Sequence, residues 1–224
     1  MTYGRSPRDS PGRRVLSLFA DAPVSARAHV WVRWATCPFP AVAAQLPRAG
    51  RILEIGCGHG LLSLHLALMS ADRRVQGIDV DVGKLAAARA AAARGGLSCT
   101  FEKVEGDHLP AGPWDGIAIV DVLYLLPADG QLGLLRSCAA ALATGGVLVV
   151  KEMALAPRWK AAWNAAQETA AVRILRITQG DELTFLPPTE LAAAMTGAGL
   201  DVRHRPIHRG YPHPHYLFVG QRPQ

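Results

Sequence analysis

A glycine-rich turn with an acid on either side is the segment most able to do chemistry. The turn carries Gly56, Gly58 and Gly60 and follows a short apolar run. Glu54 stands two positions before the first glycine, and Asp79 ends the next apolar run. Glycines let a backbone approach a ligand closely, and a helix start offers unpaired N–H donors. A carboxylate at the end of the neighbouring strand can accept hydrogen bonds from both hydroxyls of a ribose.

The spacing within this turn separates three classes of ligand. A dinucleotide fingerprint would need glycine at position 61, where leucine stands, and a P-loop would need Gly-Lys-Ser/Thr after its glycines. Because the turn holds no lysine, the sequence favours a ligand without phosphate groups. The structural alternative is that the glycines make only a tight turn and that Asp79 caps the following helix.

Strand-like and helix-like patterns alternate through the middle of the chain and would position these residues. Because right-handed crossovers place helices on both faces, this order predicts a parallel sheet. Two segments near the end of the chain predict an antiparallel pair. The predicted strands are 51–55, 74–79, 99–104, 116–120, 147–152, 202–208 and 216–220, and the predicted helices are 61–71, 84–94, 129–143, 157–177 and 189–196.

The charge balance is basic, with 24 Lys and Arg against 18 Asp and Glu, but the excess lies at the two ends of the chain. A duplex-binding surface needs its basic patch on the folded body, so the sequence argues against nucleic acid as a partner. The four cysteines form no CxxC pair, and no apolar stretch approaches the ~18 residues of a membrane span. We therefore expect a reduced, cytoplasmic protein with no membrane span and no metal site.

In five ordered motifs the chain resembles the class I S-adenosylmethionine-dependent methyltransferases. The resemblance covers residues 50–220 and implies a doubly wound α/β fold. Its sheet would have seven mostly parallel strands with an antiparallel last strand, and helices on both faces. The resemblance also implies S-adenosyl-L-methionine as cofactor, S-adenosyl-L-homocysteine (SAH) as product, and no metal. The motifs are the glycine turn at 54–60, Asp79, and the stretches 106–110, 114–124 and 186–200.

The expected organisation of the chain has three parts. Residues 1–14 are expected to be a flexible basic arm, 15–50 an N-terminal helical cap, and 51–224 the methyltransferase domain. Members of the family often place elements that cover the acceptor between the fifth strand and the last helix. By that resemblance, 155–187 is expected to be a substrate-covering insertion. The oligomeric state stays open between monomer and homodimer.

The resemblance assigns roles on the cofactor side of the site. The glycines would line the methionine part of the cofactor, and Glu54 would orient that end. Asp79 would bind the ribose, Asp107 would bind the adenine amino group, and His108 would lie beside the ring. Asp121 would face the sulfonium and the incoming substrate. The implied cofactor-binding set is Glu54, Gly56, Cys57, Gly58, Gly60, Asp79, Val80, Asp107, His108 and Asp121.

The implied reaction is transfer of a methyl group to a small or medium-sized, hydrophobic acceptor, at oxygen in the first place, with nitrogen and carbon as alternatives. A natural-product or lipid intermediate would fit this description. The candidate catalytic residues are Asp121 and Tyr124, with the histidines of the closing segment as further candidates for a base. The expected substrate-binding residues are Trp31, Trp159, Trp163 and Tyr211. The spacing of the second and third tryptophans, i and i+4, fits a core stripe equally well.

Two other functions stay open at this point. An RNA or protein methyltransferase could recruit its substrate through the basic termini, and its binding would weaken steeply with added salt. A non-catalytic partner protein would bind S-adenosylmethionine but transfer no methyl group to any acceptor.

Overall fold

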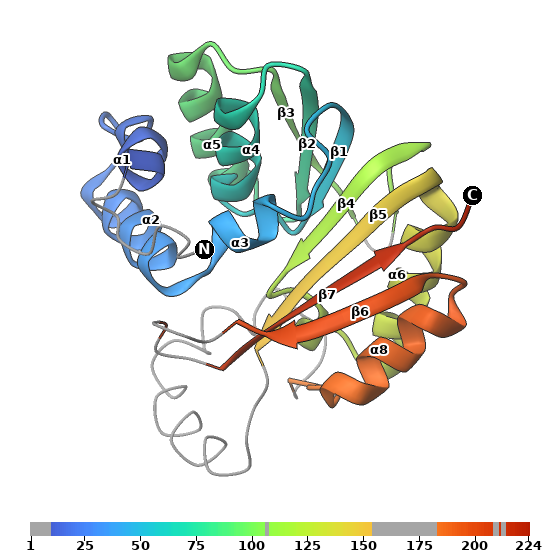
Figure 1. Cartoon of the computed structure of the whole chain (residues 1–224). Coiled ribbons are helices and arrows are strands. Elements are labelled where there is room, and N and C mark those ends of the chain that lie inside the picture. Colours follow the sequence, from blue (N-terminus) through green and yellow to red (C-terminus); the bar gives the residue numbers. More distant parts are fainter. Residues whose placement is uncertain (1–9, 106–107, 154–182, 208–210, 212–213) are drawn as a thin grey trace.

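The chain folds around a seven-stranded sheet in the order β3-β2-β1-β4-β5-β7-β6 (Figure 1). The computed structural model describes residues 10–105, 108–153, 183–207, 211 and 214–224. The doubly wound α/β fold expected from the sequence is confirmed, including the antiparallel last strand. The strands are β1 (Gly50–Ile55), β2 (Arg73–Asp79), β3 (Cys99–Lys103), β4 (Trp114–Val120), β5 (Leu142–Met153), β6 (Asp201–Pro206) and β7 (His215–Gln221).

The strand order reverses beside β1. From β1 the chain runs outward through β2 and β3, and it then returns to place β4 on the other side of β1. Ile55, the last residue of β1, pairs with Ile78 of β2 and Ile119 of β4, so these three strands end at the same edge. Open α/β sheets bind ligands at such a switch point, just past the carboxyl ends of the strands. The glycine turn after β1 lies at this point.

Helices cover both faces of the sheet, and each face has its own apolar core (Figure 1). On one face, the N-terminal helices together with α4 and α5 pack on strand residues such as Ile52 and Val149. On the other face, α6 and α8 pack on strand residues such as Ile117 and Val150. No helix among the described residues is long and apolar enough to cross a membrane. The helices are α1 (Ser10–Ser17), α2 (Val24–Thr36), α3 (Phe39–Ala43), α4 (Leu61–Met69), α5 (Val82–Gly95), the short η1 (Leu123–Leu125), α6 (Ala128–Ala141) and α8 (Pro188–Gly197).

Two element boundaries differ from the sequence expectation. α1 begins inside the 1–14 segment that was expected to be a flexible arm, because its apolar side, with Val15 fully buried, packs into the core. The helix expected over 129–143 ends at Ala141. Gly145 and Gly146, which follow that predicted helix in the sequence, lie within β5, where the ladder to β4 is irregular. A Cβ at Gly146 would lie 2.9 Å from the carbonyl oxygen of Trp114, so close strand approach explains this glycine.

A buried arginine ties the N-terminal region to the sheet. Arg73, at the start of β2, is 2% exposed. Its Nε donates to the Pro47 carbonyl at 2.7 Å, and its two Nη atoms donate to the carbonyls of Leu66 and Leu46 at 3.1 and 3.3 Å. No carboxylate pairs with it within the ranges that the structure describes. The guanidinium therefore joins β2 to two other segments: the last turns of α4 and the chain that follows α3.

We predict that Arg73→Met lowers the free energy of unfolding by about 2–4 kcal/mol, because it leaves buried carbonyl groups without donors. Arg74→Met is the matched control, since the neighbouring side chain is exposed. It should change the free energy of unfolding by less than about 0.5 kcal/mol. Urea denaturation followed by circular dichroism measures both values, and equal small changes would contradict the bridging role.

Candidate active site

The glycine turn after β1 has a backbone conformation that favours glycine. Gly56, Gly58 and Gly60 have φ angles of 67°, 53° and 71°, in the left-handed region. A Cβ at Gly56 would lie 2.4 Å from Val122, and one at Gly60 would lie 2.6 Å from Phe101. At Gly58 the nearest atom would be 3.8 Å away. The two outer glycines thus permit close packing, while the backbone of the middle one stays open to a ligand.

Asp79, the last residue of β2, lies directly against this turn. Its Oδ2 accepts a hydrogen bond from the Gly58 N–H at 2.7 Å, and its Oδ1 accepts one from the Asp81 N–H at 2.9 Å. The cap of the following helix is Asp81, which accepts from the N–H groups of Gly83 and Lys84. Each carboxylate oxygen has two lone pairs, and Asp79 is partly exposed. Asp79 therefore keeps acceptor capacity beside the open part of the turn.

Glu54 is buried beneath the turn and holds the start of α4. Its Oε2 accepts hydrogen bonds from the Ser63 N–H at 2.9 Å and the Ser63 hydroxyl at 2.5 Å. Burial raises the pKa of Glu54 to about 7, and the hydrogen bonds from Ser63 act against that rise. Glu54 is 3% exposed, so it fixes the position of the helix that follows the turn.

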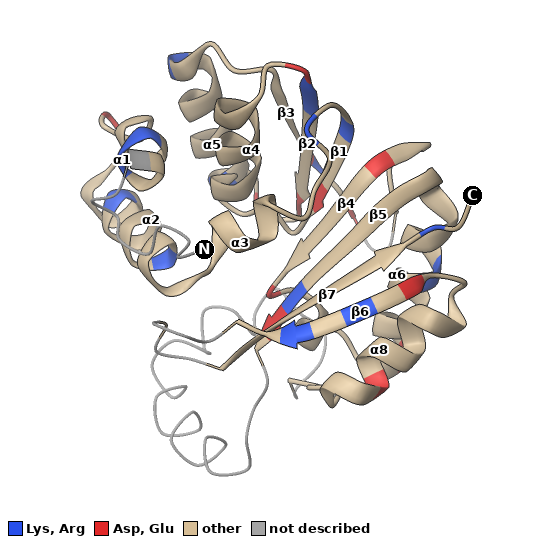
Figure 2. Cartoon of the chain, viewed as in Figure 1, with Lys and Arg blue, Asp and Glu red and all other residues tan. Residues whose placement is uncertain are grey.

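A buried charge cluster occupies the carboxyl ends of β4 and β5. The two oxygens of Asp121 lie 2.6 and 2.7 Å from Lys151 Nζ, and its Oδ2 lies 2.6 Å from an Nη atom of Arg33. Lys151 is fully buried, and Arg33 reaches the cluster from α2. Burial alone would raise the pKa of Asp121, but Lys151 and Arg33 hold it well below its usual range. Asp121 therefore stays ionised and is a weak base. Figure 2 shows basic and acidic residues side by side at the end of β5.

The last residues of β5 also hold the backbone that follows β4. Asp121 has a φ of 57° and is the one non-glycine residue with positive φ in the described part of the chain. Such a conformation costs about 1–3 kcal/mol unless the surroundings fix it. The Asp121 N–H donates to the Lys151 carbonyl at 2.9 Å, and the N–H groups of Val122 and Leu123 donate to Glu152 Oε1 at 3.1 and 2.9 Å. β5 therefore fixes, through three hydrogen bonds, the 121–123 segment that packs against the glycine turn.

Tyr124 lies in η1, next to this segment. Its ring stacks on Phe185 with the centroids 4.9 Å apart, and its carbonyl accepts the Thr184 N–H at 3.0 Å. Burial raises the pKa of Tyr124, and the negative charges of Asp121 and Glu152 add to the rise. The phenol thus stays neutral and keeps its proton as a hydrogen-bond donor.

The helix α2 lies across the strand ends. The ring of His29 packs on the ring of His59 from the glycine turn, with the centroids 4.9 Å apart. Arg33 reaches the end of β4, and the Thr36 carbonyl lies 3.0 Å from His215 Nε2 on β7. These three helix residues are spaced i, i+4 and i+7, which places them on one face. Burial, together with the neighbouring His29, lowers the pKa of His59 to about 4, so its ring is uncharged at neutral pH.

The structure brings together part of the site expected from the sequence. The three glycines, Glu54, Asp79, Asp121 and Tyr124 surround the carboxyl ends of β1, β2 and β4. Cys57 is buried in the turn, and burial raises the pKa of its thiol. Val80 and His108 are exposed beside β2 and after β3.

The residues expected to bind the acceptor are not gathered in this way. Trp31 is 51% exposed. It lies on the opposite side of α2 from Arg33, because two residues turn a helix by about 200°. Tyr211 meets His215 edge-on, with the ring centroids 5.6 Å apart. Asp107, Trp159 and Trp163 lie outside the described residues, as does most of the expected insertion at 155–187.

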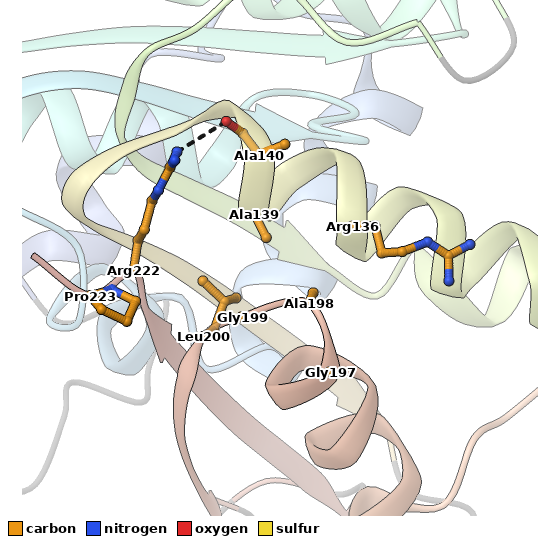
Figure 3. Close-up of a pocket in the computed structure, with 9 residues that line it drawn as sticks. All are labelled: Arg136, Ala139, Ala140, Gly197, Ala198, Gly199, Leu200, Arg222 and Pro223. Carbon is orange, nitrogen blue, oxygen red and sulfur yellow. Dashed lines mark hydrogen bonds between the residues drawn. The ribbon is translucent and has the colours of Figure 1, made fainter.

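A groove of about 580 Å³ lies at the opposite edge of the sheet, by the start of β5 and the end of β7 (Figure 3). Its walls come from α6, from the chain after α8 and from the C-terminal residues. The Arg222 guanidinium donates to the Ala140 carbonyl, as Figure 3 shows, and also to the Leu142 carbonyl, so it is occupied within the fold. This groove is separate from the switch point. Within the described ranges, no group of three or more His, Cys, Asp or Glu side chains could hold a metal ion.

Sequence reasoning missed three charged residues of the site: Arg33, Lys151 and Glu152. Lys151 and Glu152 carried a signal, because charged residues at the end of a predicted buried strand need partners. Arg33 carried none, since its contact with Asp121 spans 88 positions and depends on where α2 lies.

Residues 52–146 match a family model described as a methyltransferase domain. The ubiquinone biosynthesis O-methyltransferase of Caulobacter sp. (strain K31) is 32% identical over 166 residues, which cover 72% of this chain and 63% of that protein. The protein of the same name from Xanthomonas axonopodis pv. citri (strain 306) is 30% identical over 165 residues, which cover 72% of this chain and 67% of that protein. The match thus spans about two thirds of the length of these relatives.

A solved structure agrees with this assignment at the level of the fold. Magnesium protoporphyrin IX methyltransferase (ChlM) from Synechocystis PCC 6803, with bound SAH, aligns with a TM-score of 0.63 and 18% identity, covering 97% of each chain. The fold, the glycine turn with its neighbouring acid, and the sequence relatives all point the same way. The chain belongs to the class I S-adenosylmethionine-dependent methyltransferases.

Proposed function

We propose that this protein transfers a methyl group from S-adenosylmethionine to a hydroxyl group of a small, hydrophobic acceptor. The observation that carries the proposal is the meeting of the open glycine turn, Asp79 and Asp121 at the switch point of the sheet. The relatives' printed name, an O-methyltransferase of ubiquinone biosynthesis, supports oxygen as the acceptor atom.

The residues at the switch point fit the methyl donor. Asp79 keeps lone pairs for the two ribose hydroxyls while it holds the Gly58 N–H. At Gly58 the atom nearest to an added Cβ would be Lys84 Cδ at 3.8 Å, an ordinary contact, and we assign this side of the turn to the methionine part. The turn itself has no lysine, and the Lys84 side chain, which reaches Gly58 from α5, is paired with Asp81, so these residues favour a nucleoside over a nucleotide.

When bound, the donor supplies a methyl group that its sulfonium already activates. In the transfer the acceptor oxygen bonds to the methyl carbon, the electron pair of the broken S–CH₃ bond stays on the sulfur of SAH, and the hydroxyl proton passes to water. The protein's task is therefore to align the acceptor oxygen with the S–CH₃ bond, and orientation alone can contribute about 7–11 kcal/mol. Asp121 is ionised and engaged by two cations, so we assign it to placing charge beside the donor rather than to taking a proton. Tyr124, as a neutral phenol, would orient the acceptor as a hydrogen-bond donor.

Apolar and aromatic residues near the strand ends support a hydrophobic acceptor. The stacked pair Tyr124 and Phe185 would form one wall of its site. Trp31 faces away from Arg33, so it would contact only an acceptor that extends beyond the strand ends. Tyr211 remains a proposed acceptor contact of the same kind. Trp159 and Trp163 remain proposed acceptor contacts from the sequence.

The function is tested with S-adenosylmethionine that carries a labelled methyl group and a panel of phenols and catechols with and without alkyl tails. We expect label in the tailed compounds first, on oxygen. A folded protein that binds the donor but labels none of them, and labels RNA or protein instead, would contradict the proposed acceptor class.

We predict that Asp79→Ala weakens binding of S-adenosylmethionine at least 100-fold, because two hydrogen bonds to a charged acceptor are lost. Asp81→Ala is the matched control on the same loop. It removes the cap of α5 and lowers stability by about 1 kcal/mol, but it should leave the dissociation constant within threefold. Isothermal titration calorimetry gives both constants. If Asp79→Ala binds S-adenosylmethionine as tightly as wild type, Asp79 does not bind the ribose.

We predict that Asp121→Asn lowers kcat more than it weakens donor binding. The neutral amide leaves Lys151 and Arg33 without a counter-charge, so the variant should also lose about 3–5 kcal/mol of stability. Adding Lys151→Met to the Asp121→Asn variant removes one unpaired cation and should recover part of that stability. Turnover and donor affinity, both measured below the melting temperature, separate the two effects. Equal losses in kcat and in affinity would make Asp121 a part of the donor pocket alone.

A further inference from the structure

Glu152 is a buried carboxylate to which the proposed reaction gives no role. It is 7% exposed, and its Oε1 accepts the N–H groups of Val122 and Leu123. Its other oxygen, Oε2, is enclosed and has no hydrogen-bond partner in the part of the chain that the structure describes. An enclosed carboxylate oxygen without a donor favours the protonated form of the group.

The charges around Glu152 act in the same direction. Burial raises the pKa of Glu152 to about 8, and the negative charge of Asp121 adds to the rise. Lys151 and the two backbone donors act against it. With Glu152 protonated, the cluster of Arg33, Lys151 and Asp121 carries one net positive charge. The titratable and charged groups packed around Glu152 are Asp121 after β4, Tyr124 in η1, Lys151 on β5, Tyr216 opposite it on β7, and, beyond Asp121, Arg33 on α2.

Glu152 lies directly behind the segment that would meet the donor. Its Oε1 holds the backbone of Val122, and the Val122 side chain packs so closely on Gly56 that no Cβ could fit there. A cation bound over the glycine turn would therefore be separated from the buried Glu152 carboxyl by the Val122 segment. In such surroundings a nearby positive charge favours the ionised form of a carboxylic acid.

We propose that Glu152 is a positioning residue that holds a proton in the free protein and releases it when the positively charged methyl donor binds. This inference rests on the proposed function. The ionised Glu152 then balances the charge that the sulfonium adds to the cluster. After methyl transfer the product SAH carries no sulfonium charge, and Glu152 takes up a proton from solvent again. The site thus returns to its starting charge with product still bound.

The test counts the protons released on binding, by calorimetry at pH 7.5 in buffers of different ionisation enthalpy. Wild type and Glu152→Gln are titrated with S-adenosylmethionine and with SAH. The glutamine keeps an oxygen for both backbone N–H groups. The donor's own amino group titrates near pH 7.7–8.0, but it does so in both proteins. The difference between the proteins is therefore the measured quantity.

We expect wild type to release at least 0.5 proton more than Glu152→Gln with S-adenosylmethionine, and about the same number with SAH. Glu54→Gln is the matched control, since among the described residues Glu54 is the other buried carboxyl group with a raised pKa. Equal proton counts in wild type and Glu152→Gln would overturn the inference. So would loss of the release in Glu54→Gln instead. If wild type binds S-adenosylmethionine without releasing a proton, only this inference is wrong. If wild type does not bind S-adenosylmethionine at all, the proposed function is wrong as well.

A measurement on the wild type alone covers the case in which Glu152→Gln does not fold. Difference infrared spectroscopy should show a protonated carboxyl band that disappears when S-adenosylmethionine is added and persists when SAH is added. The band unchanged by either ligand would contradict the proposal.

The free protein gives an independent prediction. Because the pKa of Glu152 is higher in the folded state than its unfolded value of about 4.3, the folded state holds more protons between these values. Glu152 should therefore make the free energy of unfolding fall as pH rises from about 5 to about 8, while His59 and His65, whose pKa values burial lowers to about 4, act in the opposite direction below about pH 6.5. The contribution of Glu152 is the difference between the two proteins, so the free energy of unfolding should fall less, or rise more, with pH in Glu152→Gln than in wild type. Urea denaturation across this pH range measures both slopes, and identical slopes would contradict a protonated Glu152.

Discussion

The hydrogen bond from the Gly58 N–H to Asp79 is the contact on which the site depends. It joins the turn after β1 to the end of β2, and it can form only because both strands end at the same edge of the sheet. The positive φ of Gly58 points its N–H toward the carboxylate and leaves the other side of the backbone open. This hydrogen bond thus holds the Asp79 carboxylate, which can accept hydrogen bonds from ligand hydroxyl groups, next to glycine backbone that a ligand can approach closely.

The second constraint is electrostatic. Asp121 stands in a strained backbone conformation, and β5 supplies both the carbonyl that holds its N–H and the cation that neutralises its side chain. Burying such charges is costly unless each is paired, so the cluster is a poor choice for stability alone. Its place beside the glycine turn, and the link to α2 through Arg33, relate it to the site instead. A donor that itself carries positive charge would have to be accommodated by this cluster, and we propose that the neighbouring Glu152 gives up a proton when it binds.

The sequence predicted the sheet well because its signals are local. The apolar run Gly116–Val120 forms a buried strand, as predicted. The closely spaced glycines at 56, 58 and 60 form a turn in which all three have positive φ. The sequence failed where structure depends on distant contacts. Gly145 and Gly146 look like a helix end, but they lie within β5, where the backbones of Ala143 and Trp114 leave no room for a Cβ at Gly146. Nothing near Arg33 in the sequence indicates that it reaches Asp121.

A crystal structure with S-adenosylmethionine or SAH bound is the most direct measurement of how the site holds its cofactor. We expect the two ribose hydroxyls within hydrogen-bonding distance of the Asp79 carboxylate and the sulfur or sulfonium between the glycine turn and the Asp121–Leu123 segment. Ligand density elsewhere, such as in the groove lined by Arg136 and Arg222, with Asp79 still bonded only to protein, would contradict this assignment.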